Sequence, residues 1–294
     1  MRIHLAFLSI IAIINISAFS QSEPDTTRHW KSGGSTAINF SQVSLTNWAA
    51  GGENSVSGTF LFNAFMNYTK GKTAWENTLD VGYGLTKQGA ENMIKTEDRF
   101  QLVSKYGRQA SRFWYYTALA DFKTQLDKGY KDPPENSILT SKFLSPAYLL
   151  LSLGMDYKPN DNFSLYLSPL TGKWTIVNDD ELSQQGAFGV DPGKNVRSEF
   201  GASLKSIFKK ENIIENVDFM TRLDLFSNYS NNPQNIDVEW ETKFDFRVNS
   251  FLSANLGTTL LFDDDIKYIT DEGVERGARI QFKQLFGFGI NFKF

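Results

Sequence analysis

Cysteine is absent from all 294 residues of the chain. Its absence excludes disulfide bonds, thiolate metal sites, a cysteine nucleophile and a lipidated N-terminal cysteine. Neither sign of charge dominates, because 30 Lys and Arg stand against 33 Asp and Glu, for a net charge of −3. Since there is also no basic tract, we predict no nucleic-acid partner.

Histidine is scarce, occurring only at His4 and His29, and both precede the first predicted strand. A Ser–His or Asp–His mechanism therefore has no base in the rest of the chain. Glu239 and Glu241 lie two residues apart, but Lys243 shares their side of the segment, and mixed charge of this kind is typical of a structural face. We predict a non-enzymatic protein with no catalytic, cofactor-binding or metal-binding residue and no cofactor.

Long hydrophobic runs are missing except at the start. Residues 5–16 form an apolar run interrupted only by Ser9 and Asn15, too short for the ~20 residues of a membrane-spanning helix. Small residues at Ala18 and Ser20 fit a cleavage site, so we predict a signal peptide over 1–20, a flexible periplasmic lead-in over 21–34 and a barrel over 35–294. A hydrophobic content of 41% and a mean hydropathy of −0.33 exclude a bundle of membrane helices.

What the chain has in abundance is aromatic residues with a period of two. Aromatic residues make up 14% of the sequence, including 25 Phe. In IDVEWETKFDFRVNS (236–250), alternate residues are apolar or aromatic and the others are almost all charged. Twelve segments of this kind predict strands near 35–44, 55–69, 74–87, 96–106, 112–125, 146–157, 162–176, 197–208, 216–228, 236–249, 251–263 and 278–294. Pro169 and Gly172 predict a kink or an early end in the seventh.

The connections between these segments alternate between short and longer, which is typical of outer-membrane barrels with short periplasmic turns and longer external loops. The last segment carries a stripe of Phe and Ile on alternate residues and stops at Phe294, which looks like the signal that such barrels present to their assembly machinery. We therefore predict an all-β fold: a transmembrane antiparallel up-and-down barrel of about 12 strands. The aromatic side of 236–250 is then assigned to lipid and the charged side to the interior, and we expect Trp240→Arg to impair assembly more than Glu241→Gln.

Three features leave alternatives open. Charges of both signs on the inner side either pair across strands and close the lumen or line a narrow polar pore. The loop at 127–145 either folds over the mouth or is an ordinary exposed loop. The acidic runs at 179–181 and 263–265 offer oxygen ligands for Ca²⁺, yet neither has an EF-hand spacing.

Several loop motifs resemble those of a family of Bacteroidota outer-membrane proteins described as a domain of unknown function. The motifs are NWAAGGENS (47–55), FLSPAYL (143–149), LYLSPLTGK (165–173), GAFGV (186–190) and LFSNY (225–229). The resemblance covers nearly the whole mature chain and implies a barrel in the cell outer membrane of a Gram-negative bacterium. It implies no catalytic or ligand-binding residue.

From these features we expect an integral, porin-like outer-membrane barrel that acts as a narrow channel or as a structural or partner barrel in the cell envelope. The alternatives are a barrel enzyme and a ligand-binding or adhesin-like barrel that uses its external loops. The expected partners are outer-membrane lipid, the barrel assembly machinery and other envelope proteins. The transported solute and the oligomeric state stay open.

Overall fold

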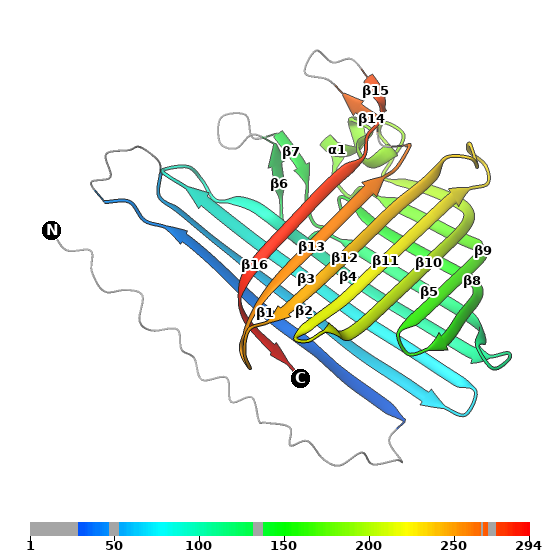
Figure 1. The fold of residues 1–294 in the computed structure, drawn as a ribbon. Coiled ribbons are helices and arrows are strands. Elements are labelled where there is room, and N and C mark those ends of the chain that lie inside the picture. Colours follow the sequence, from blue (N-terminus) through cyan, green and yellow to red (C-terminus); the bar gives the residue numbers. More distant parts are fainter. Residues whose placement is uncertain (1–28, 47–52, 132–137, 266, 270–274) are drawn as a thin grey trace.

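The computed structural model describes residues 29–46, 53–131, 138–265, 267–269 and 275–294. Within these ranges, twelve strands pair with their neighbours in antiparallel order, and the last pairs with the first to close a barrel (Figure 1). The barrel strands are β1 (Trp30–Val43), β2 (Ser55–Lys70), β3 (Thr73–Gln88), β4 (Ile94–Gln109), β5 (Trp114–Thr124), β8 (Ala147–Asn160), β9 (Phe163–Ile176), β10 (Val196–Ile214), β11 (Val217–Asn228), β12 (Ile236–Arg247), β13 (Leu252–Phe262) and β16 (Gln281–Lys293). The predicted fold, an antiparallel up-and-down barrel of twelve strands, is confirmed.

Some strands are longer than predicted, because their backbone pairing continues beyond the residues in which apolar and polar side chains alternate. β1 begins at Trp30, not at residue 35, because its ladder with β2 continues to the Trp30↔Tyr68 pair. β10 likewise runs through most of the predicted 209–215 turn, with a register shift between Lys210 and Ile214. The predicted signal peptide and most of the predicted lead-in, residues 1–28, lie outside the described residues.

Pro169 does not end β9, but it lies where the pairing of β9 with both neighbouring strands is irregular. The strand continues to Ile176, and its pairing shifts by one residue beside Pro169 against both β8 and β10. Proline cannot donate a ladder hydrogen bond, and a bulge absorbs the missing bond while the strand goes on. The predicted irregularity is therefore a bulge.

The connections keep the predicted alternation of length. Tight links join β2 to β3, β4 to β5, β8 to β9, β10 to β11 and β12 to β13, whereas the links at the other end of the barrel are longer. In the β2–β3 turn Gly71 has φ +55°, a left-handed conformation that glycine adopts without steric cost. The long links carry structure of their own, which the sequence did not predict: β6 (Gly129–Lys131), β7 (Ile138–Ser141), the helix α1 (Asp180–Gln184), the 3₁₀ turn η1 (Ala187–Gly189), β14 (Lys267–Ile269) and β15 (Glu275–Ala278).

The barrel is apolar outside and polar inside. Large apolar side chains are exposed on the outer wall, Trp240 at 51% and Phe286 at 66% among them. The described side chains buried inside the barrel are mostly polar or charged, such as Gln101, Asp156 and Glu241. Among the described residues, none of the helices is both long enough and apolar enough to cross a membrane.

Candidate functional site: the charged lumen

The inward side of β12 shows how the alternating sequence places charges in the lumen. Ile236 and Trp240 are exposed on the outer wall, while Glu241, the neighbour of Trp240, is 3% exposed inside. Successive side chains of a strand point to opposite faces, so one register fixes the whole set. The predicted assignment of the aromatic side to the exterior and of the charged side to the interior is confirmed.

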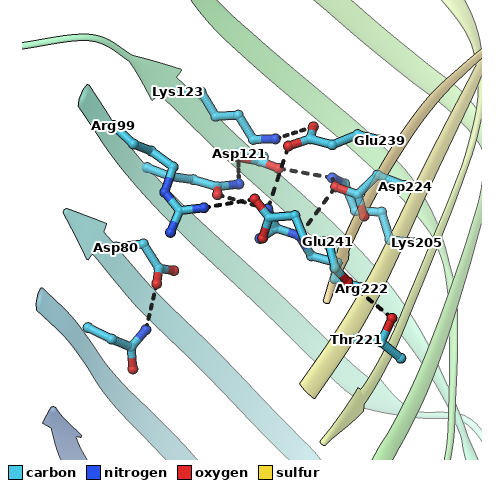
Figure 2. Close-up of polar contacts among 12 residues, drawn as sticks. Asp80, Arg99, Asp121, Lys123, Lys205, Thr221, Arg222, Asp224, Glu239 and Glu241 are labelled. Carbon is cyan, nitrogen blue, oxygen red and sulfur yellow. Dashed lines mark hydrogen bonds and ion pairs between the residues drawn. The ribbon is translucent and has the colours of Figure 1, made fainter. Parts of the chain in front are cut away.

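Glu241 joins opposite walls of the barrel. Its Oε1 accepts a hydrogen bond from Arg99 Nη1 of β4 at 2.7 Å, and its Oε2 lies 3.1 Å from Arg222 Nη2 of the adjacent β11 (Figure 2). In the closed order, five strands separate β12 from β4 in either direction, so the Arg99–Glu241 pair spans the full lumen. The side chains of opposite walls therefore meet at the barrel axis.

Further pairs extend this contact into a network, which we call the lumen network (Figure 2). Lys205 of β10 bridges Asp121 of β5 at 2.9 Å and Asp224 of β11 at 2.7 Å. Lys123 of β5 pairs with Glu239 of β12. Gln101 links the pairs around Lys205 to the pairs around Glu241, since it donates to Asp121 at 2.9 Å and accepts from Arg222 at 3.2 Å.

Ion pairs continue from the lumen network toward both ends of the barrel. At the turn end, Lys105 pairs with Asp156 at 2.7 Å, and Lys158 pairs with Glu76 at 2.5 Å. At the loop end, Lys173 pairs with Asp237 at 2.6 Å. Of the two arrangements that the sequence allowed, charges pairing across the lumen or charges lining an open pore, the structure has the paired one.

The loops over the far end carry a small apolar core. Val177, Leu182 and Val190 are fully buried around α1, and Leu139 of β7 and Phe188 of η1 pack against them. Figure 1 shows β6, β7 and α1 together beyond the same end of the barrel. The described part of the predicted 127–145 loop is therefore ordered and packed against α1, while residues 132–137 lie outside the described residues.

The two acidic runs are held by protein contacts. Asp179 accepts a hydrogen bond from the Leu182 backbone N–H at 3.0 Å as the N-cap of α1. Asp265 pairs with Arg197 at 3.1 Å, and Asp264 accepts a hydrogen bond from Asn235 at 2.6 Å. Within the described ranges, no three His, Cys, Asp or Glu side chains come together in a way that could hold a metal ion.

Replacing Asp179 by alanine is expected to loosen the α1 region by ~1 kcal/mol, the usual cost of losing a side-chain N-cap. The Lys142 ammonium, 2.6 Å away, and the Leu182 N–H hold the pKa of the Asp179 carboxyl below its ordinary value. A lowered pKa contributes stability above the unfolded-state pKa of about 3.9, and that stability is lost as the pH falls through the folded-state pKa. Hydrogen exchange of the Leu182 amide measures both the loss of stability caused by Asp179→Ala and the loss caused by low pH. Exchange that is unchanged in Asp179→Ala at pH 7 would show that the cap is not what orders α1.

The comparisons with known proteins add no activity. Residues 40–130 match the family described as "Protein of unknown function (DUF3078)". No curated protein is significantly similar in sequence to the chain. Several solved structures are similar at low identity, and the superpositions are too loose to carry an argument, so the barrel assignment rests on the strand pairing itself.

The first of these structures is the translocator domain of the autotransporter NalP from Neisseria meningitidis, with 9% identity, a TM-score of 0.36, and 92% of this chain and 90% of that one covered. Another is OmpT, an outer membrane protein of Vibrio cholerae, with 7% identity, a TM-score of 0.29 and coverage of 90% and 97%. A third is OccK2 (OpdF) of Pseudomonas aeruginosa, with 8% identity, a TM-score of 0.23 and the same coverage.

Proposed function

We propose that this chain is an integral outer-membrane barrel, non-enzymatic, whose lumen is closed by its own ion pairs and which serves as a structural or partner barrel in the cell envelope. The observation that carries the proposal is the Arg99–Glu241 pair, which joins opposite walls through side chains that are 23% and 4% exposed. A lumen whose central charges are paired with one another presents no ring of one sign that would select a permeating ion.

The exterior supports the membrane location. Exposed aromatic and aliphatic side chains alternate with inward polar ones on strand after strand, as on the lipid-facing wall of a barrel whose interior is polar. The likeness of the loop motifs to the Bacteroidota family supports a Gram-negative outer membrane in that phylum. The partners in this proposal are outer-membrane lipid, the barrel assembly machinery during biogenesis and other envelope proteins, with no nucleic acid.

The non-enzymatic part of the proposal rests on residue types. Neither histidine nor cysteine occurs after His29. The buried carboxylates of the lumen network each lie against lysine or arginine. A carboxylate fixed between cations is a weak base, because its charged form is stabilised.

A narrow channel is the second candidate, and one observation favours it. The inward side of β13 carries Gly257 opposite Lys243, and a Cβ built at Gly257 would meet no atom closer than 4.0 Å, so this part of the wall leaves space beside the charged side chains.

Planar-bilayer recordings separate the two candidates. For the closed barrel we expect no stepwise openings from the folded wild-type protein. The double variant Arg99→Ala/Glu241→Ala removes both members of the pair that spans the lumen and is expected to open transiently, which shows that the recording detects an unblocked lumen. Regular openings of the wild type would contradict the closed lumen and favour the channel.

A further inference from the structure

The strands that close the barrel, β1 and β16, are paired over only part of their length. Their register has five pairs, from Ser35↔Lys293 to Asn39↔Gly289, and two more backbone bonds join Gly34 and Phe294. By contrast, β1 pairs with β2 along its whole length, from Trp30↔Tyr68 to Val43↔Ser55. The β1–β16 seam is therefore closed at the turn end only.

Beyond the Asn39↔Gly289 pair both strands continue without meeting. Residues 40–43 of β1 stay paired with β2, and residues 281–288 of β16 stay paired with β13. In an antiparallel ladder a residue directs its N–H and C=O to one neighbour only, and alternate residues face the other side. Each strand thus presents an unpaired edge, and Figure 1 shows β1 and β16 diverging away from the C-terminus.

A side-chain clamp stands at the point of divergence. Asn39 of β1 and Asn255 of β13 exchange amide hydrogen bonds of 3.4 and 3.3 Å across the intervening β16. They meet over Gly287, where a Cβ would lie 2.4 Å from Asn39 Nδ2 and 2.7 Å from Asn255 Oδ1. Only glycine at position 287 leaves room for the two asparagine side chains to meet there. Their hydrogen bonds hold β1 against β16 and β13 up to this residue.

Past the clamp, the inner and outer surfaces of the wall are both exposed. Phe40, Phe282 and Phe286 face outward and are exposed, like the large apolar side chains elsewhere on the outer wall. Ser41 and Lys283 face inward and are exposed as well, Lys283 with a side chain that is 52% exposed. Lys283 reaches across the inside of the gap to Glu97 of β4 at 3.0 Å.

The unpaired part of the seam extends into the bilayer if the barrel spans it. A spanning strand uses ~9–11 residues, and β16 has 13, of which the 281–288 stretch faces the gap. Unpaired backbone groups are tolerated at membrane depth where they line a hydrated cavity, and the exposed inward Ser41 and Lys283 fit that condition. The unpaired stretch therefore lies between inward-facing residues, Ser41 and Lys283, and outward-facing phenyl rings of the same wall.

We propose that the unpaired part of the β1–β16 seam is a lateral portal that admits an acyl chain of a membrane lipid from the bilayer into the barrel. The proposal rests on the membrane location proposed above. Of the edge residues 40–43 and 281–288, Lys283 alone is charged, and it faces inward. The outward rim carries four phenyl rings, of Phe40, Phe282, Phe286 and Phe288, beside the uncharged Gln42 and Gln284. An apolar chain fits the phenyl rings of this rim, and Lys283, paired with Glu97 but with a side chain that is 52% exposed, can also contact a polar head group.

The two edges also match each other in a closed register. Continuing the ladder by its constant step would pair Phe40 with Phe288 on the outside, and Ser41 with Gly287 and Val43 with Leu285 on the inside. Each of these pairs keeps apolar residues outward and small or aliphatic residues inward, as the existing ladder does. The portal can therefore close without any change of register.

Quenching by brominated phospholipid tests the portal, since the cysteine-free chain accepts single labels. A fluorophore is attached at Ser41→Cys, facing inward at the portal. A matched control is attached at Thr86→Cys, inward at the same register level, because Ser57 pairs with both Ser41 and Thr86 across the intact wall. A second control at Phe60→Cys faces outward on β2. Each labelled protein is folded into vesicles of phospholipid brominated on its acyl chains.

We expect strong loss of fluorescence at Phe60→Cys and Ser41→Cys and only background loss at Thr86→Cys. No quenching at Phe60→Cys would overturn the membrane location itself. Quenching at Phe60→Cys with none at Ser41→Cys would overturn the portal and leave the membrane location intact. Disulfide-linked dimers of unlabelled Ser41→Cys would also overturn it, since a second copy would then cover the gap.

Discussion

Replacing Glu241 by glutamine is expected to destabilise the folded barrel by ~3–5 kcal/mol, the usual cost of removing one partner of a buried ion pair. Glu241 is 3% exposed and lies between Arg99 and Arg222. Without its charge, Arg99 loses the partner that spans the lumen, and Arg222 keeps only more distant carboxylates, Glu239 at 3.7 Å and Asp224 at 3.9 Å. Two partly buried guanidinium groups would then be left poorly compensated.

Urea unfolding of the protein in phospholipid vesicles measures this loss. The matched control is Glu239→Gln on the same strand, where the carboxylate is 26% exposed and the expected loss is smaller because water reaches the pair. The double variant Arg99→Gln/Glu241→Gln should be less destabilised than the sum of its single variants, because it also removes Arg99, the cation that Glu241→Gln leaves without its partner. Additive losses would show that the two side chains do not interact across the lumen.

This result would also correct the order that the sequence predicts for two neighbouring substitutions. From the alternating pattern, Glu241 is simply one inward residue in a mixed-charge row, and its neutralisation looks milder than a cation on the lipid face. The structure places it at the contact between opposite walls instead. We therefore expect Glu241→Gln to be at least as destabilising as Trp240→Arg.

The strands and the side on which each residue lies could be predicted because both are local properties. Period-two alternation fixes the face of every residue in a strand once one residue is placed. Turn residues such as Gly71 and the Asn249-Ser250 link mark where the chain reverses. For this reason all twelve barrel strands could be located to within six residues, and the outward position of Trp240 followed from the sequence alone.

The partners of the inward charges could not be predicted, because they depend on how the sheet closes. Arg99 and Glu241 are 142 residues apart and meet only for one combination of strand tilt and stagger. The gap in the β1–β16 seam has the same origin, since nothing in the alternation of residues 281–288 says where pairing stops. The α1 helix is different: an N-cap Asp179 followed by acidic residues in the first turn is a signal that the sequence did contain.

The lumen network and the β1–β16 seam differ in the number of bonds that hold the barrel strands together. Charged side chains that pair across the lumen connect β4 and β5 to β10, β11 and β12. By contrast, β1 and β16 are joined by backbone pairing at six residue pairs, supported by the Asn39–Asn255 clamp that crosses β16. Fewer bonds at the seam mean a lower free energy for local opening there than in the network wall. Any motion that admits a ligand is therefore expected at the seam, with the wall that carries the network staying fixed.

Replacing Trp240 by arginine is expected to destabilise the barrel by ~2–4 kcal/mol, the cost of a cation on the lipid-facing side near the middle of a bilayer. Trp240 is exposed on the outer wall near the centre of β12, and its indole N–H donates to Thr221 Oγ1 at 2.9 Å. Ile236→Arg is the matched control, because it is outward on the same strand but at its loop end, where the expected cost is only ~0–1 kcal/mol. Trp240→Phe separates the loss of the Thr221 bond from the effect of charge, and urea unfolding in vesicles gives all three values. A cost of Ile236→Arg equal to that of Trp240→Arg would mean that the middle of β12 does not lie in hydrocarbon, because only a bilayer makes the cost of an outward cation depend on its depth.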